Sequence, residues 1–267
     1  MLRSIEQLLG YGLFAKNDDV GKCKDLLFDD RWWTIRYMVA DTGNWLVGHQ
    51  VLVSPHMIVK ADWKTRHILL NISKQKLEEC PTPLEHETVS REHEKKIFQY
   101  FGYPYYWSGP GLWGSEPFPI ATDAVLAAQM HEEADSKKEN KKENHLRSFK
   151  VVKGYDIKAL DGEIGHVKDF IVDDKSWALR YVVVDTRNWF PGGKKVLLSL
   201  DWARSIDWAE STFEVDLKKE QIENAPEFDP EQPVNVETEV RLYDYYGRPM
   251  EANIDKRLQQ NIGNPFL

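Results

Sequence analysis

Residues 21–45, GKCKDLLFDDRWWTIRYMVADTGNW, recur as residues 165–189, GHVKDFIVDDKSWALRYVVVDTRNW, at an offset of 165 − 21 = 144 positions. One extra residue then moves the offset to 196 − 51 = 145, and the pattern Val-Leu-x-Ser recurs at residues 51–54 and 196–199. Because the match holds over strand-forming and turn-forming positions alike, we expect both segments to adopt the same fold.

The repeat continues to the far end of each copy, where Tyr-x-Gly-x-Pro occupies residues 100–104 and 245–249. The repeated unit is therefore about a hundred residues long, which is the size of a domain and not of a short solenoid repeat. The sequence predicts a first repeat, a connector, a second repeat and a tail, at residues 1–104, 105–146, 147–249 and 250–267.

The duplication provides an internal test of chemistry, since a side chain present in one copy cannot be essential to a site shared by both. None of the eight histidines and neither of the two cysteines recurs at the matching position of the other copy. Acid–base catalysis and metal binding rely heavily on histidine, and no glycine-rich phosphate loop follows a predicted strand. We therefore expect no catalytic centre, no metal site and no cofactor, and predict that the chain is not an enzyme.

The composition is that of a globular protein, with 267 residues, 42% hydrophobic residues and a formal net charge of −8. The negative charge disfavours nucleic acid as a partner, because affinity for phosphates comes largely from lysine and arginine. Two cysteines without a partner spacing fit a reducing compartment. No signal peptide or membrane span is predicted. We expect a cytoplasmic protein, for which peripheral association with a membrane complex stays open.

Each copy has the hydrophobic periodicity of short strands. Residues 68–72 and 213–217 place apolar side chains at alternate positions, as in a half-buried strand. Two adjacent aspartates mark a hairpin turn, and the strand that follows, residues 35–40 or 179–184, is apolar on both faces. Such a strand is expected to be covered on both sides. A mainly β fold with a small closed barrel in each copy satisfies this requirement.

Short helices are predicted after the last strand of each copy. Residues 73–79 and 218–224 end shortly before a proline, and residues 92–101 and 238–246 end at a glycine with a proline two residues later. Both arrangements are helix-stop signals.

The repeated pattern Asp-Asp-x-x-Trp-x-x-Arg-Tyr-x-Val-x-Asp-Thr-x-Asn-Trp, preceded by Gly-x-x-x-Asp and followed by Val-Leu-x-Ser, resembles the PRC-barrel family. The Tyr-x-Gly-x-Pro ending is similar to the tail of its free-standing bacterial members. The resemblance covers nearly all of both copies and implies two tandem six-stranded β-barrels with short C-terminal helices. The family is named after the cytoplasmic domain of the photosynthetic reaction-centre H subunit and also occurs at the C-terminus of a ribosome-maturation factor. This sequence shows neither the membrane helix of the first nor the RNA-associated domain of the second, so the resemblance implies a fold without naming a function.

Two oppositely charged residues recur on the predicted hairpin. If the first hairpin turns at residues 30–31, Asp25 lies opposite Arg36 in a cross-strand ion pair. The second copy would place Asp169 opposite Arg180 in the same way. The pair would either stabilise the hairpin or present its arginine to a ligand carboxylate or phosphate.

Aromatic residues give the stronger indication of an interaction surface, because several follow polar turns or continue from a helix stop into the connector. With two leucines, the candidate surface comprises Trp45, Leu46, Leu69, Tyr105, Tyr106, Trp107, Trp113, Trp189 and Phe190. We expect the connector aromatics to dock on a barrel. Since aromatics often dominate interface energies, the set is expected to pack inside the chain, between the barrels, or between subunits of a homodimer burying on the order of 1,600 Å².

The leading functional hypothesis is a non-enzymatic interaction or scaffold module that binds a protein partner or itself. The family resemblance alone suggests two alternatives. One is an RNA or ribosome-assembly accessory, which the acidic charge disfavours, and the other is a support of a membrane electron-transfer complex. The sequence does not identify the partner.

Overall fold

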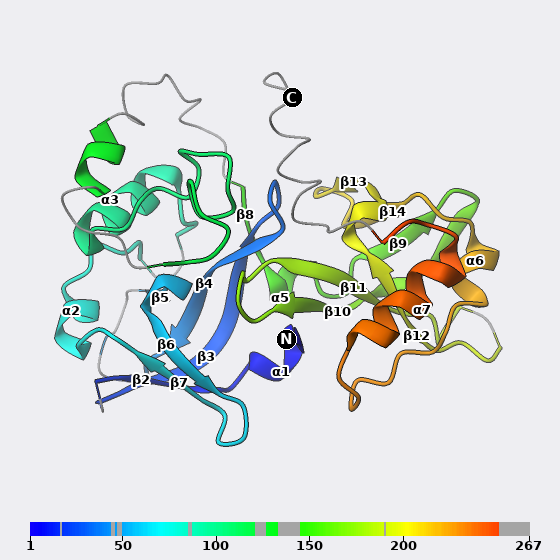
Figure 1. The fold of residues 1–267 in the computed structure, drawn as a ribbon, viewed down its shortest axis with the longest axis horizontal. Helices are drawn as coiled ribbons and strands as arrows, with labels where there is room; N and C mark the ends of the chain where they lie inside the picture. Colours follow the sequence, from blue (N-terminus) through cyan, green and yellow to red (C-terminus); the bar gives the residue numbers. More distant parts are fainter. Residues whose placement is uncertain are drawn as a thin grey trace. The chain divides into compact units, whose positions relative to one another are not determined.

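In the computed structural model the chain forms two compact units (Figure 1). The first unit comprises Leu8–Ser148, and the second unit comprises Met1–Gln7 with Phe149–Leu267. The structure describes residues 1–16, 18–43, 46, 50–84, 87–120, 127–132, 145–189 and 191–250. The units differ from the ranges of the repeat at two places, because residues 1–7 fall in the second unit and the connector falls in the first.

Both units are mainly β, and each contains one seven-stranded mixed sheet. The first unit holds β2 (Gly12–Ala15), β3 (Asp18–Asp29), β4 (Thr34–Asp41), β5 (Val51–Val53), β6 (Ile58–Asp62) and β7 (His67–Leu70) in the order β5-β4-β3-β2-β7-β6. The second holds β9 (Asp156–Ala159), β10 (Gly162–Asp173), β11 (Leu179–Asp185), β12 (Lys195–Ser199), β13 (Ala203–Asp207) and β14 (Thr212–Val215) in the order β12-β11-β10-β9-β14-β13. The matching orders confirm that the two repeats share one topology.

The closed six-stranded barrel is not confirmed in either unit. The end strands of each six-strand path are joined along the chain by a short 3-10 helix, η1 (Pro55–Met57) between β5 and β6 and η2 (Leu200–Trp202) between β12 and β13. Within the described ranges no strand pairing joins the two end strands of either path. The repeated serines explain the Val-Leu-x-Ser pattern, since Ser54 and Ser199 cap η1 and η2 through their hydroxyl oxygens.

The seventh strand of each sheet comes from the start of the other repeat. β1 (Leu2–Ser4) pairs antiparallel with β10 in the second unit, and β8 (Leu146–Ser148) pairs antiparallel with β3 in the first. Both strands have the sequence Leu-Arg-Ser. The two repeats therefore exchange their first strands, which places residues 1–7 outside the unit formed by the rest of their own repeat.

Matching hydrogen bonds anchor the exchanged strands. The hydroxyl of Ser4 donates to the carboxylate of Asp169, and that of Ser148 donates to the carboxylate of Asp25, both at 2.5 Å. The arginine before each serine pairs with a turn aspartate of the same sheet, Arg147 with Asp30 at 2.6 Å and Arg3 with Asp174 at 3.5 Å. The repeated aspartates of the hairpin thus hold a strand that belongs to the other repeat.

The hairpin turn between β3 and β4 is longer than the sequence analysis predicts. Asp29 aligns with Thr34, so residues 30–33 form the turn, and a carboxylate oxygen of Asp29 accepts the backbone N–H of Arg31 at 2.9 Å. Trp33 adopts a left-handed φ of +50°, and the residue at the same place in the second unit has a φ of +60°. This conformation is uncommon outside glycine. Stacking of Trp33 on Phe28 at 5.5 Å helps to hold it in the first unit.

One glycine recurs because the neighbouring strand leaves no room for a side chain. Gly21 and Gly165 both have a φ of +122°. A Cβ atom would lie 2.0 Å from the carbonyl oxygen of Asp41 at the first position and 2.6 Å from that of Asp185 at the second. Only glycine fits such a close approach without displacing the backbone.

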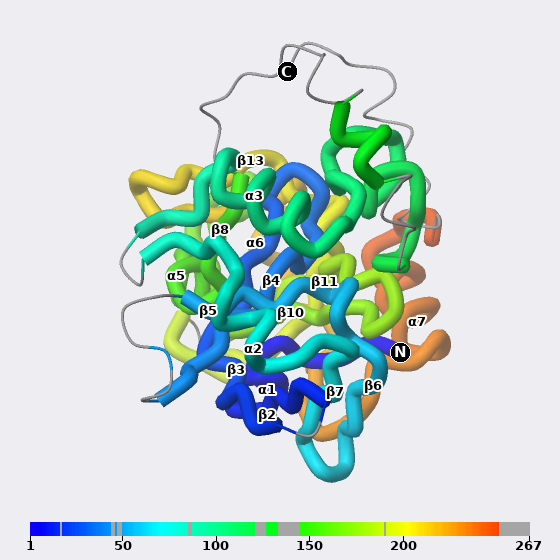
Figure 2. The backbone as a smooth tube through the Cα atoms, turned by 90° about the vertical axis from the view of Figure 1, so that its left-hand side faces the viewer, coloured from blue at the N-terminus to red at the C-terminus, as the bar shows by residue number. Residues whose placement is uncertain are grey.

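The predicted helices are present. They are α2 (Lys74–Glu78) and α3 (Arg91–Phe101) in the first unit, and α6 (Lys219–Glu223) and α7 (Val236–Tyr246) in the second. α3 and α7 end at glycines with left-handed φ angles of 69° and 63°. In the first unit, α3 packs on β4 through the buried ring of Phe98, which lies 6.4 Å from that of Tyr37. Figure 2 traces the backbone of both elements. In the described part of the chain, no helix combines the length and the apolar character needed to cross a membrane.

Candidate interaction surface

The aromatic segment, residues 105–113, is packed into the first unit. Tyr105 and Tyr106 are 0% exposed and Trp113 is 1% exposed. The ring of Trp107 stacks on that of Tyr105 at 4.6 Å and lies 5.6 Å from that of Phe98 on α3. The expected docking of these rings on a sheet unit is confirmed. Tyr105, Tyr106 and Trp113 form part of the interior of the first unit, and Trp107 is half-buried against it.

The aromatic segment covers a buried arginine on β4. The guanidinium of Arg36 lies 3.7 Å from the ring centre of Tyr106 and 4.8 Å from that of Trp113. It donates a hydrogen bond to the carbonyl oxygen of Leu112 and forms an ion pair with Asp29 at 3.4 Å. The Arg36 side chain is completely buried. Cation–π contacts and a carbonyl acceptor thus surround a charge that water no longer reaches.

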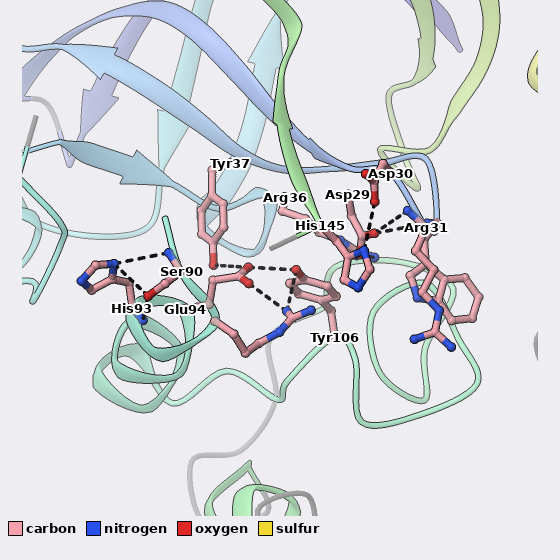
Figure 3. Close-up of polar contacts among 12 residues, drawn as sticks. Asp29, Asp30, Arg31, Arg36, Tyr37, Ser90, His93, Glu94, Tyr106 and His145 are labelled. Atoms are coloured by element: carbon pink, nitrogen blue, oxygen red, sulfur yellow. Dashed lines mark hydrogen bonds and ion pairs between the residues drawn. The ribbon is translucent and has the colours of Figure 1, made fainter. Parts of the chain in front are cut away.

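A carboxylate on α3 completes this network (Figure 3). Glu94 accepts hydrogen bonds from the hydroxyls of Tyr37 at 3.3 Å and Tyr106 at 2.9 Å, and from the guanidinium of Arg91 at 2.8 Å. Burial raises the pKa of Glu94 to about 7, although Arg91 and the Tyr106 hydroxyl both favour the carboxylate form. Such a buried group depends on all of its donors, so the aromatic segment is tied to the unit by polar as well as apolar contacts.

In the described part of the second unit, the strand and helix part of this network recurs without an aromatic cover. The hydroxyl of Tyr181 on β11 donates to Glu239 on α7 at 2.6 Å, and Arg180 forms an ion pair with Glu239 at 3.6 Å. Among the residues that the structure describes, Glu239 is the only hydrogen-bond or ion-pair partner of the Arg180 side chain, and no aromatic ring lies over the guanidinium. Arg180 is 15% exposed at its side chain, compared with 0% for Arg36.

Two positions of α3 that touch the aromatic segment are cationic. The guanidinium of Arg91 lies 4.1 Å from the ring centre of Trp107, and the ammonium of Lys95 lies 5.9 Å from that of Tyr105. At the offset of 145, these positions of α3 correspond to Val236 and Val240 of α7. The equivalent surface of the second unit therefore has apolar side chains where the first has cations.

Both valines are accessible, Val236 at 66% and Val240 at 43% of their surface. They are four residues apart on α7 and so lie on one side of the helix, next to Glu239. We define the open face as Arg180, Val236, Glu239 and Val240. It combines a partly exposed guanidinium with an apolar pair, at the place where the first unit is covered by the aromatic segment.

The other described candidate residues are divided between the two units. Leu69 on β7 is 41% exposed and belongs to the first unit, whereas Trp189, which follows β11, is 37% exposed and belongs to the second. Leu46 is half-buried. Trp45 and Phe190 lie outside the described residues. The described candidates therefore do not form a single exposed surface within either unit.

The predicted cross-strand ion pairs are wrong. Asp25 aligns with Val39, and Asp169 aligns with Val183. The cause is a longer hairpin turn together with a register shift at the arginine of each β-hairpin. Leu27 pairs with Tyr37 and Phe28 with Ile35, so Arg36 is the extra residue, and the second unit skips Arg180 in the same way. The arginines pair elsewhere, Arg36 with Asp29 and Arg180 with Glu239.

A cavity of about 140 Å³ lies beside the exchanged strand of the second unit. Its lining comprises Ser4, Glu6, Gln7, Lys168, Asp169, Val183, Lys195, Phe228 and Pro230. Burial raises the pKa of Asp169 to about 6, although its hydrogen bonds from Ser4 and the backbone favour the carboxylate. The charges in the lining are mixed, and the carboxylate of Asp169 is already bonded to the exchanged strand. In the described ranges, no group of three or more His, Cys, Asp or Glu side chains is arranged to hold a metal ion.

Comparison with known proteins supports the family resemblance over the second repeat. Residues 146–222 match the family model described as the PRC-barrel domain. The matched range begins at the exchanged strand β8 and ends within α6. No curated protein matches the chain. The first repeat shares the strand order of the matched one.

The sequence analysis did not single out two pairs of site residues, although the members of each pair are separated by the repeat offset. Glu94 and Glu239 are 145 positions apart, and Ser4 and Ser148 are 144 apart. Both pairs pass the same test of recurrence that the histidines fail. Glutamate on a polar helix and serine near a chain end are common residues, so only the offset distinguishes them.

Proposed function

We propose that this chain is a non-enzymatic interaction or scaffold module, and that the open face of the second unit is its contact surface. The match of residues 146–222 to the PRC-barrel domain supports an interaction or scaffold role. The observation that carries the proposal is the exposure of Val236 and Val240 on the helix whose Glu239 pairs with Arg180, at positions whose equivalents in the first unit contact the aromatic segment. Adjacent exposed apolar side chains with a charged neighbour are typical of contact surfaces.

The finer features of the proposal follow the family resemblance. We propose that the two sheets act as a tandem of PRC-type barrels, that the chain catalyses no reaction, and that it binds a protein. Self-association is part of the proposal and would involve exposed aromatics such as Trp189. Roles in ribosome assembly or in a membrane electron-transfer complex rest on the resemblance alone.

The test is capture of partners from an extract of the native cells with the tagged full-length protein. The double variant Val236→Glu with Val240→Glu places two negative charges on the open face. Val59→Glu is the matched control, because Val59 is 67% exposed on β6 of the first unit. We expect the same proteins with the wild type and the control and their loss with the double variant, while the circular dichroism of all three is unchanged.

Capture that the double variant retains in full would overturn the proposed surface. Recovery of ribosomal RNA by the wild type and not by the double variant would instead favour the ribosome-assembly role. Size-exclusion chromatography of the same three proteins tests self-association, which predicts an elution volume that depends on protein concentration.

A further inference from the structure

We infer that the open face binds an extended aromatic segment of a different protein, with a tyrosine or tryptophan ring on the guanidinium of Arg180 and a backbone carbonyl as its hydrogen-bond acceptor. The inference rests on the proposed function, because it names the ligand class of the same surface. It is drawn from the internal comparison between the two units.

The first unit shows what this type of surface accepts. Arg36 there contacts two aromatic rings and the carbonyl oxygen of Leu112, all from the aromatic segment, in addition to its ion pair with Asp29. A guanidinium has five N–H donors. Arg180 uses its donors within the described residues only toward Glu239, at 3.6 Å. Its Nε is buried without a hydrogen-bond partner in the described residues, so the equivalent group of the second unit has donors left for a ligand.

The valines define the rest of the ligand chemistry. In the first unit, the cations Arg91 and Lys95 lie over the rings of the aromatic segment. Val236 and Val240 offer apolar contact at the same positions and contribute no positive charge. An acidic peptide would meet Glu239 and find only Arg180 to neutralise it. A neutral aromatic segment satisfies all four residues, because its rings pack on the valines and on Arg180.

The chain itself does not supply the matching segment. A second copy carries its aromatic segment buried in its own first unit, with Tyr105 and Tyr106 completely inaccessible. The tail, residues 251–267, contains Phe266 as its only aromatic residue and no tyrosine or tryptophan. The inferred occupant is a segment of another protein.

The probe is a fluorescein-labelled peptide with the sequence of residues 105–116, YYWSGPGLWGSE, titrated with the full-length protein by fluorescence anisotropy. We expect saturable binding with a dissociation constant on the order of 10–1,000 μM. Arg180→Ala and the double variant Val236→Glu with Val240→Glu should each weaken binding by about tenfold or more, which corresponds to one stacked ring with its hydrogen bond. Val59→Glu should bind as the wild type does. A peptide with alanine at its four aromatic positions should not bind.

Each remaining outcome contradicts the inference in a recognisable way. Absence of binding at 1 mM, or binding that Arg180→Ala leaves unchanged, means that the ligand is not of this class. Binding only to a protein shortened to residues 1–250 means that the tail occupies the face. Self-association that the valine variants abolish assigns it to a second copy. If these variants still lose partners from the cell extract while the peptide fails to bind, the proposed function stands and only the ligand class falls.

Discussion

The two units share a strand order and a polar network, yet the same surface is closed in one and open in the other. In the first unit, residues 105–113 bury Arg36 beneath two rings. In the second, Arg180 keeps part of its surface in water and α7 exposes two valines. The difference arises just beyond the end of each repeat, because only the first repeat leads into the aromatic segment. A duplicated domain thus differs in its capacity for contact while its fold stays the same.

The largest expected effect is the removal of the covered arginine. Arg36→Ala leaves Asp29 buried without its ion pair, which is expected to lower the free energy of unfolding by about 3–5 kcal/mol. Arg180→Ala should cost about 1 kcal/mol, because Arg180 is partly exposed. Urea unfolding, monitored by hydrogen exchange of the backbone amides of β4 and β11, measures the loss of free energy in each variant. Equal losses in the two variants would mean that the aromatic cover does not distinguish the units.

A pH dependence should belong to the covered network. Burial raises the pKa of Glu94 from 4.5 to about 7, so the folded state favours the protonated acid. The stabilisation is complete below pH 4.5 and is lost as the pH rises through 7. The free energy of unfolding of the wild type minus that of Glu94→Gln should therefore fall by on the order of 1–3 kcal/mol across this window. A flat difference between pH 4.5 and 7.5 would show that Glu94 titrates as an exposed acid does.

The exchanged strands offer a matched pair of smaller changes. Ser4→Ala removes a hydrogen bond from Asp169, which is 6% exposed, and should cost about 2 kcal/mol. Ser148→Ala removes the equivalent bond from the half-buried Asp25 and should cost about 1 kcal/mol. Midpoints of urea unfolding at constant slope give both values. A larger loss of stability for Ser148→Ala than for Ser4→Ala would contradict the expectation that the more buried hydrogen bond contributes more.

The smallest effect on stability is expected at the open face itself. Val236→Ser and Val240→Ser replace exposed apolar groups, so each should change the free energy of unfolding by no more than about 0.5 kcal/mol. Thermal unfolding by calorimetry provides the measurement. A loss above 1 kcal/mol would indicate that these valines pack against the protein and are not available to a ligand.

Much of the fold follows from the repeat and from local signals. The offset predicts one topology for both copies, and the glycines after α3 and α7 predict where these helices end. The strand exchange could not be predicted in this way. Both first strands read Leu-Arg-Ser, so each sheet receives the same three side chains whether the strand comes from its own repeat or from the other. Only the path of the chain between strands and units decides the pairing.

The candidate site was predicted in part, for reasons of a different kind. Apolar area alone favours burial of the rings of residues 105–113, and those of Tyr105, Tyr106 and Trp113 are buried. Register is harder to predict, because a single extra residue in a bulge changes every pair beyond it. For this reason the predicted ion pairs of Asp25 and Asp169 are wrong. The role of Glu94 depends on helix packing, which no spacing in the sequence specifies.

The strand exchange determines the order in which strands can pair while the chain is synthesised. Ser4 aligns with Ile171, so the first strand waits until β10 has been made, whereas β8 meets a β3 that is already complete. At about 5–20 residues per second, that wait is roughly 10–30 s. The first unit can close before the ribosome has finished the second. Residues 2–4 are therefore synthesised well before β10 but are among the last of this sequence to take their place in a sheet.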